Sequence, residues 1–132
     1  MKRKILFLCT GNSCRSQMAE GFAKKLGWDA YSAGTHPKIA TNCNAIKAMS
    51  EIGIDISHQK PESLDLYSDQ NFSIVASVCD NAKQSCPIFN GRSDSIIHKS
   101  FKDPEKVKGS KEDILNEFRV VRNLIKIWID SL

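Results

Sequence analysis

Residues 3–16 read Arg-Lys-Ile-Leu-Phe-Leu-Cys-Thr-Gly-Asn-Ser-Cys-Arg-Ser. The nearly continuous apolar run that ends at Cys9 is typical of a strand buried on both faces of a sheet. From Ser16 onward, apolar residues recur at helical spacing as far as Leu26, and Gly27 follows, as expected for an amphipathic helix that a glycine terminates. The sequence therefore predicts a buried strand, a glycine-containing loop and a helix, in that order.

The same alternation continues along the rest of the chain. It predicts strands at residues 28–33 and 72–78 and a weak one at 96–97, and helices at residues 44–52 and 111–132. Strands that alternate with helices favour a parallel sheet covered by helices. We therefore expect an α/β fold in which a four-stranded parallel sheet is flanked by helices, with residues 1–132 forming a single catalytic domain.

Length and composition agree with one domain. The 132 residues, 41% of them apolar, provide a sizeable core but are too few for two ordinary domains. Nineteen Lys and Arg against fifteen Asp and Glu give a net charge of +4, which suits an anionic substrate. A nucleic-acid partner would need a clustered basic face, so we expect none.

The N-terminal apolar run, Ile5 to Cys9, is shorter than the roughly 7–15 residues of a signal-peptide core, and no later stretch approaches the about 18 residues that cross a membrane. We therefore expect a cytoplasmic protein without membrane association. Nothing in the sequence indicates an oligomer, so we expect a monomer. Five cysteines, an odd number in a reducing compartment, argue against a static disulfide framework and for chemistry, metal binding or burial.

Cys9 and Arg15 bracket a five-residue loop between the first strand and the first helix. Backbone N–H groups of such a loop converge at a helix N-terminus, where the helix dipole favours a tetrahedral oxyanion. The same field favours a thiolate at Cys9, and the guanidinium of Arg15 offers two donors to the anion. Together with Arg15, the predicted substrate-binding residues are Thr10, Gly11, Asn12, Ser13 and Cys14.

Two further roles are predicted in this loop. Gly11 is expected to adopt a backbone conformation that a side chain would hinder. Ser16 is expected to donate a hydrogen bond to the Cys9 sulfur, which stabilises the thiolate and makes the sulfur a better leaving group. The catalytic group that the loop predicts is therefore Cys9, Arg15 and Ser16.

Simpler interpretations of these residues exist. Cys9 can be the buried end of a strand and Arg15 a solvated first-turn residue, although the strand, cysteine, glycine loop, arginine and helix must then coincide by accident. Cys14 is interpreted as a small apolar residue at the end of the loop. A zinc half-site at Cys9 and Cys14 lacks an accompanying Cys-x-x-Cys or His-x₃₋₅-His motif, so we expect no metal.

A second pair of thiols, Cys79 and Cys86, lies seven positions apart in a polar stretch that follows a predicted strand. On one helix this spacing is two turns and about 10.5 Å of rise, beyond the roughly 7 Å between Cα atoms that a disulfide tolerates. Joining the two sulfurs would require the segment to unwind, which is the basis of a redox switch. Two unrelated half-buried cysteines are the alternative.

Asp103 precedes Pro104 in a long loop and is the candidate general acid. Displacement of an oxygen from a tetrahedral oxyanion leaves hydroxide or alkoxide, which departs readily only when an acid donates a proton. An Asp-Pro pair often does no more than start a turn, which is the alternative interpretation.

Residues 9–21 resemble the active-site segment of the arsenate reductases built on the low-molecular-weight protein tyrosine phosphatase fold. Residues 75–87, Val-Ala-Ser-Val-Cys-Asp-Asn-Ala-Lys-Gln-Ser-Cys-Pro, are similar to the redox segment of the thioredoxin-coupled members, and phosphatases of this fold generally lack that pair of cysteines. Cys43 departs from the family pattern, and burial or an adventitious thiol is expected there. The stretch 98–102 also departs, since a tryptophan-containing, less basic stretch is expected in close relatives.

The resemblance implies a thiol relay. Cys9 attacks arsenate held by the loop and Arg15, and Asp103 protonates the departing oxygen. Cys79 then attacks the Cys9 sulfur and releases arsenite, and Cys86 attacks Cys79 to leave a Cys79–Cys86 disulfide. Thioredoxin or a similar dithiol reductant reduces this disulfide.

The resemblance implies no cofactor, although three positions match those that hold a structural potassium ion in some members. These are Asn12, Glu20 and Ser32, while the later ligand region, residues 58–62, differs from theirs. The alternative function is a phosphomonoesterase of the low-molecular-weight protein tyrosine phosphatase type, which needs only Cys9, Arg15 and Asp103. A third, non-catalytic alternative is a redox-sensing module.

Overall fold

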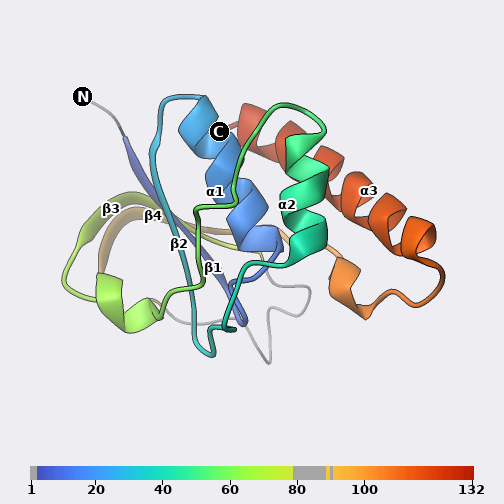
Figure 1. The fold of residues 1–132 in the computed structure, drawn as a ribbon. Coiled ribbons are helices and arrows are strands. Elements are labelled where there is room, and N and C mark those ends of the chain that lie inside the picture. Colours follow the sequence, from blue (N-terminus) through green and yellow to red (C-terminus); the bar gives the residue numbers. More distant parts are fainter. Residues whose placement is uncertain (1–2, 79–88, 90) are drawn as a thin grey trace.

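The computed structural model describes residues 3–78, 89 and 91–132 (Figure 1). Within these residues four parallel strands form one sheet in the order β2-β1-β3-β4. The strands are β1 (Lys4–Cys9), β2 (Asp29–Gly34), β3 (Asn71–Ser77) and β4 (Arg92–His98). The predicted four-stranded parallel sheet in one α/β domain is confirmed.

The three α-helices of the described part pack on one face of this sheet (Figure 1). They are α1 (Arg15–Lys25), α2 (Cys43–Ser50) and α3 (Lys111–Asp130), each within two residues of its predicted limits. A one-turn 3₁₀-helix, η1 (Leu64–Tyr67), contributes Tyr67 to the opposite face, where it packs against the aromatic ring of Phe72. A second 3₁₀ turn, η2 (Pro104–Lys106), lies in a region that the sequence predicts as a loop.

Strand β1 runs through the centre of the sheet and is buried on both faces. Ile5 and Phe7 pack among the three α-helices, and Leu6 and Leu8 pack against the opposite cluster that includes Tyr67. These four β1 side chains are at most 1% exposed. Full burial on both faces is the reason that the sequence of β1 is continuously apolar rather than alternating.

Strand β4 is longer than its sequence predicts. It spans seven residues, whereas only Ile96 and Ile97 carry an apolar signal. As the outermost strand next to β3 it is solvated over much of its surface, and Ile96 is 71% exposed. Its polar residues take part in the sheet through backbone hydrogen bonds, which periodicity cannot detect.

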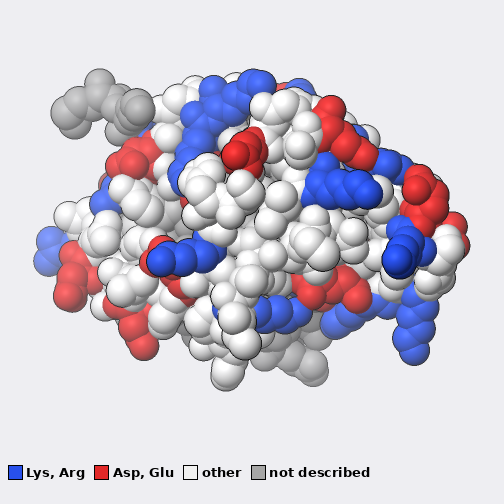
Figure 2. Space-filling model, in the orientation of Figure 1, with Lys and Arg blue, Asp and Glu red and all other residues white. Residues whose placement is uncertain are grey.

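The surface carries both signs of charge. Figure 2 shows Lys and Arg side chains interspersed with Asp and Glu over the face seen in Figure 1. On α3, Arg119 forms ion pairs with Glu51 and Glu112, and Arg122 also pairs with Glu51, which joins α3 to the end of α2. Among the described helices, none combines the length and apolar character needed to span a bilayer.

The α3 helix offers a matched test of the core. Phe118 is 1% exposed and Leu124 is 52% exposed on the same helix. We expect Phe118→Ala to lower the free energy of unfolding by about 3–5 kcal/mol, because it leaves a cavity between the helices and the sheet. Leu124→Ala is expected to change it by less than about 1 kcal/mol. Urea unfolding followed by circular dichroism measures both, and equal losses would contradict this assignment of the core.

Candidate active site

The loop that follows β1 lies where the topology of the sheet reverses. From the end of β1 the chain passes to β2 on one side, while β3 lies on the other side. In open parallel sheets, ligand sites form beyond the carboxyl ends of the strands at such a point. A cavity of about 400 Å³ is present there, and its lining includes the loop residues Cys9, Thr10, Gly11, Ser13, Cys14 and Arg15 and the more distant His36, Lys38, Asp103, Glu105 and Lys106.

Helix α1 begins in this loop without a side-chain cap. Its N-cap residue, Cys14, makes no side-chain hydrogen bond to the first turn. By contrast, Asn42 accepts from two backbone N–H groups at the start of α2, and Ser110 forms a capping box with Asp113 at α3. No side chain of the N-cap residue therefore occupies the first-turn amides of α1. These N–H groups can donate to a bound anion instead, and the positive end of the helix dipole favours its charge.

The loop owes its shape to Asn12 rather than to Gly11. Asn12 has a φ of 50°, in the left-handed region, and it is fully buried. Its Oδ1 accepts from the backbone N–H of Glu62 (2.8 Å) and from Gln17 Nε2 (3.3 Å). These hydrogen bonds, with one to Ser16, offset the cost of a left-handed backbone in a residue other than glycine.

The sequence predicts for Gly11 a backbone conformation that a side chain would hinder, but the structure gives a different reason for a small residue there. Gly11 does not have a positive φ, and a Cβ atom placed there would lie 3.2 Å from Cε of Lys38. The backbone N–H of Lys38 also donates to the carbonyl of Gly11 (2.9 Å). A small residue at position 11 therefore lets the segment after β2 pack closely on the loop.

Ser16 lies under the loop in the first turn of α1 and is fully buried. Its Oγ accepts a hydrogen bond from Nδ2 of Asn12 at 2.7 Å. A hydroxyl that accepts in this way still has its own proton to donate. The contact between Ser16 and the Cys9 sulfur stays a prediction.

Arg15 and Asp103, distant in sequence, meet at the cavity. Arg15 is 6% exposed, and one of its terminal nitrogens donates to the carbonyl of Phe101 at 3.0 Å. Its other terminal nitrogen lies 3.7 Å from Oδ2 of Asp103. The predicted nucleophile Cys9 lines the same cavity and is 4% exposed. The structure thus brings together the predicted nucleophile, anion-binding arginine and acid.

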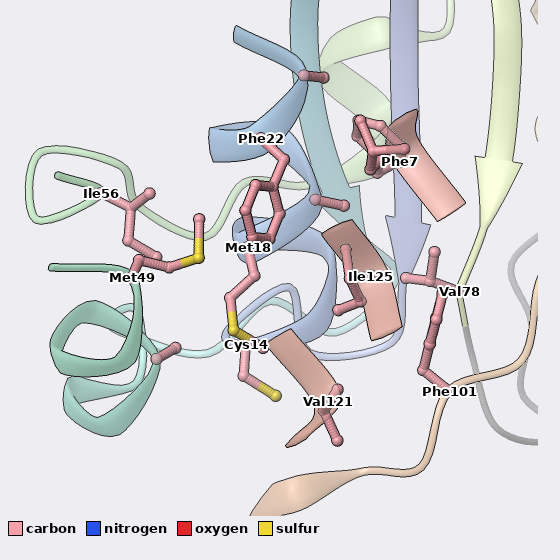
Figure 3. Close-up of a cluster of buried hydrophobic side chains, with 14 of the residues drawn as sticks. Phe7, Cys14, Met18, Phe22, Met49, Ile56, Val78, Phe101, Val121 and Ile125 are labelled. Atoms are coloured by element: carbon pink, nitrogen blue, oxygen red, sulfur yellow. The ribbon is translucent and has the colours of Figure 1, made fainter. Parts of the chain in front are cut away.

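Cys14 has the buried position expected of a small apolar residue. It is 3% exposed and lies beside Met18 and Val121 in the helix-side core (Figure 3). Burial, followed by the charges of Glu105 and Asp103, raises the pKa of the Cys14 thiol well above its ordinary value. Cys14 is therefore a protonated thiol near neutral pH and a poor nucleophile.

Glu105, in η2, is a site residue that sequence reasoning missed. Its two carboxylate oxygens accept from Ser13 Oγ and from Lys38 Nζ, each at 2.5 Å. Burial raises the pKa of Glu105, but hydrogen bonds from Lys38, Ser13 and Cys14 outweigh burial and hold this pKa below its usual value. The signal in the sequence is a second carboxylate two positions after the candidate acid, which a short turn places on the same side.

Three groups of the kind that bind metal ions are close together here. The ligand atoms of Cys14, Asp103 and Glu105 lie within 4.8 Å of one another. Each carboxylate already faces a cation, Arg15 for Asp103 and Lys38 for Glu105. The cluster is therefore balanced by the cations of the chain itself.

Of the three remaining cysteines, the structure describes only Cys43. Cys79 and Cys86 lie outside the described residues. Val78 is the last described residue before them, and its N–H donates to the carbonyl of Leu8 at 2.9 Å, beside the end of β1. Cys43, at the start of α2, is exposed, so of the two expectations for it burial is wrong, and an adventitious thiol stays a prediction.

Residues 4–128 match the low molecular weight phosphotyrosine protein phosphatase family. The chain belongs to this family. An arsenate reductase from Halalkalibacterium halodurans is 47% identical over 127 residues, which cover 94% of this chain and 90% of the relative. Both the predicted fold and the predicted family are therefore confirmed.

Solved structures from two branches of the low molecular weight phosphatase family are similar to this chain. An arsenate reductase in its phosphate-binding state has a TM-score of 0.82 at 32% identity, with 98% of this chain and 95% of that chain covered. A low molecular weight protein tyrosine phosphatase from T. tengcongensis has a TM-score of 0.66 at 28% identity, with 99% and 100% covered. The loop from Cys9 to Arg15, called the oxyanion loop below, is thus set in a fold that serves two chemistries.

The thiols of this family member are expected to differ in reactivity. Because burial and nearby carboxylates raise the pKa of Cys14, its reactive thiolate form stays rare up to about pH 9, whereas the Cys43 side chain is exposed to reagent. Iodoacetamide labelling at pH 8 followed by peptide mass spectrometry is expected to modify exposed Cys43 and to leave Cys14 unmodified. Labelling of Cys14 at the rate of Cys43 in the folded protein would contradict the burial and charge described here.

Proposed function

We infer that this chain is an arsenate reductase that works through a three-cysteine relay. One observation carries the relay: the backbone N–H of Val78, the residue before Cys79 in the sequence, donates to the carbonyl of Leu8, the residue before Cys9. The second pair of cysteines therefore follows, in the sequence, a residue that is paired with the strand end carrying Cys9. The curated relative that is 47% identical is named an arsenate reductase, which supports the same conclusion.

In the first step the oxyanion loop and Arg15 hold arsenate while the Cys9 thiolate attacks arsenic. A sulfur–arsenic bond forms, an arsenic–oxygen bond breaks, and Asp103 gives its proton to the departing oxygen, which leaves as water or hydroxide. The 3.7 Å between Arg15 and Asp103 supports this division of roles, because both side chains then face the same bound anion. Donors from the first turn of α1 stabilise the charge on the remaining oxygens.

In the second step the Cys79 thiolate attacks the Cys9 sulfur. A Cys9–Cys79 disulfide forms as the sulfur–arsenic bond breaks, and the bonding electron pair stays on arsenic, which is reduced from As(V) to As(III). Arsenite leaves the site. Cys86 then attacks the Cys79 sulfur, so that a Cys79–Cys86 disulfide forms and the Cys9 thiolate is released.

The Cys79–Cys86 disulfide needs an external dithiol for the next turnover. We propose that thioredoxin or a similar dithiol protein supplies the two electrons, that the chain acts as a monomer, and that it works in the cytoplasm, where such reductants keep thiols reduced. Some phosphomonoesterase activity is expected alongside, because Cys9, Arg15 and Asp103 suffice for it and phosphate shares the geometry and charge of arsenate. The similarity to a low molecular weight protein tyrosine phosphatase supports this side activity.

The relay predicts which cysteines are required for turnover. NADPH consumption with thioredoxin and thioredoxin reductase is expected to depend on arsenate. It is expected to fall by at least about a hundredfold in Cys79→Ser and in Cys86→Ser, because each substitution removes one chemical step of the relay. Cys86→Ser is expected to complete one turnover and accumulate a Cys9–Cys79 disulfide, detected by peptide mass spectrometry. Cys43→Ser, an exposed cysteine outside the cavity, is the matched control and keeps the parent rate.

Two results would contradict this function. Steady turnover of Cys86→Ser with thioredoxin at the parent rate would exclude the relay. If the parent consumes no NADPH with arsenate but hydrolyses an aryl phosphate unchanged by either substitution, the phosphatase function is favoured.

The residues that the family resemblance assigns to potassium do not fit that ion in this chain. Ser32 Oγ donates to Oε1 of Glu20 at 2.5 Å, and Lys24 Nζ lies 2.6 Å from its Oε2. Asn12 Oδ1 already accepts the backbone N–H of Glu62. Since the ammonium of Lys24 supplies the positive charge at Glu20, we propose that the enzyme works without potassium or any other cofactor.

Replacement of potassium by sodium at constant ionic strength is therefore expected to change kcat/KM for arsenate less than twofold. Lys24→Gln removes the ammonium from Glu20 and is expected to make the activity dependent on potassium. Its exposed neighbour gives the control variant, Lys25→Gln, which is expected to behave like the parent. A severalfold activation of the parent by potassium over sodium would overturn the proposal.

A further inference from the structure

The carboxylate of Glu105 joins three segments that are far apart in the sequence. It belongs to η2, directly after the candidate acid Asp103 and Pro104. One of its oxygens accepts from Ser13, in the oxyanion loop, and the other accepts from Lys38, in the segment after β2. The side chain of Glu105 is 19% exposed, so most of it lies inside the contact it makes.

Each partner of Glu105 is itself held in place. Ser13 is 4% exposed, and its carbonyl accepts from the N–H of Asn42 at 2.8 Å. Lys38 is fixed through its backbone N–H, which donates to the carbonyl of Gly11. Glu105 therefore binds two residues whose backbones are already held by hydrogen bonds. These contacts fix the η2 turn relative to the oxyanion loop.

Asp103 is coupled to Glu105 through the backbone. Its Oδ1 accepts from the N–H of Glu105 at 3.0 Å and lies 3.9 Å from the Cys14 sulfur, and its Oδ2 faces Arg15. The side-chain torsions of Asp103 are thus set by the position of the η2 turn. Whatever holds η2 on the oxyanion loop also sets where the acid points.

A carboxylate at the mouth of an anion site would by itself repel the substrate. Lys38 removes this cost, because the two side chains form an ion pair in which each stays charged. The hydrogen bond with Glu105 raises the pKa of Lys38, and the pKa of Glu105 is lowered as described above. The pair adds no net charge to the rim of the cavity, so it can hold the turn without weakening anion binding.

We propose that Glu105 is a positioning residue that holds Asp103 over the oxyanion loop by binding Ser13 and Lys38. The proposal rests on the role of Asp103 as the acid in the proposed function and deepens it. Glu105 acts through Asp103 and does not touch the reacting atoms. In aryl phosphate hydrolysis, the Cys9 sulfur bonds to phosphorus as the phosphorus–oxygen bond to the aryl group breaks, and Asp103 transfers its proton to that oxygen.

A misplaced acid has a kinetic signature that a merely weakened fold lacks. p-Nitrophenolate is a good leaving group and needs little protonation, whereas phenolate is a poor one and depends on it. The ratio of kcat/KM for p-nitrophenyl phosphate to that for phenyl phosphate therefore reports how well the acid is placed. Partial unfolding lowers both values by the same factor and leaves the ratio unchanged.

The experiment measures this ratio for the parent, Glu105→Ala, Asp103→Asn and the double variant. Glu105→Ala is expected to raise the ratio on the order of tenfold, because a displacement of about 1 Å removes much of the contribution of an acid. In the Asp103→Asn background, Glu105→Ala is expected to change the ratio less than twofold, since its effect passes through Asp103. Lys108→Ala, an exposed residue of the same loop, is the control and leaves the ratio at the parent value.

Two milder variants keep the test decisive if Glu105→Ala folds poorly. Glu105→Gln retains an amide oxygen that can accept from Ser13, so it is expected to restore most of the parent ratio. Lys38→Met removes one of the two contacts of Glu105 and is expected to give an intermediate ratio. Lys38 is 54% exposed, so this substitution leaves the core intact.

Equal losses for both esters in Glu105→Ala, or an undiminished effect in the Asp103→Asn background, would overturn the proposal. The same double-variant cycle is also measured on kcat for arsenate reduction. The role of Glu105 can then be tested even if the parent has only one of the two activities, phosphate ester hydrolysis or arsenate reduction. If the parent hydrolyses aryl phosphates with the expected coupling but does not reduce arsenate, the proposed function fails and the role of Glu105 stands. If arsenate is reduced without coupling between positions 103 and 105, the proposed function stands and the positioning role of Glu105 fails.

Discussion

The backbone hydrogen bond from Val78 to Leu8 joins the ends of β3 and β1 at the edge of the sheet where α1 begins. Parallel strands deliver their carboxyl ends to the same edge, so this pairing places the oxyanion loop and the chain that leads into the second cysteine pair side by side. A register shift of one residue would turn the side chains of β1 to the opposite face and remove Cys9 from the cavity. Burial of β1 on both faces prevents such a shift.

Charge balance is the second principle of the site. The cavity holds two carboxylates, Asp103 and Glu105, and the predicted nucleophile Cys9, all of which oppose an anionic substrate. Arg15, Lys38 and the uncapped start of α1 offset them. Lys38 is hydrogen-bonded to Glu105 and Arg15 to the carbonyl of Phe101, so both cations are held in place before an anion binds.

Some of the candidate site could be predicted and some could not, for physical reasons that differ between residues. Cys9 and Arg15 are local to one loop, and their spacing is a property of the sequence. The left-handed backbone falls on Asn12 rather than Gly11, since hydrogen bonds from Glu62 and Gln17, which depend on the fold, decide it. Strand β4 escapes prediction over most of its length because an edge strand is held by backbone pairing and needs no apolar pattern.

The sequence by itself determined the class of fold, because apolar periodicity encodes local backbone structure. The family followed from the resemblance of two short segments to known motifs, and Cys9 is the nucleophile that the first of these segments predicts. Only the tertiary structure decided which distant groups share the site. The meeting of Glu105 with Ser13 and Lys38, and of Asp103 with Arg15, arises from the packing of separate loops on one edge of the sheet. Such contacts depend on three-dimensional proximity, for which a single sequence carries no periodic signal.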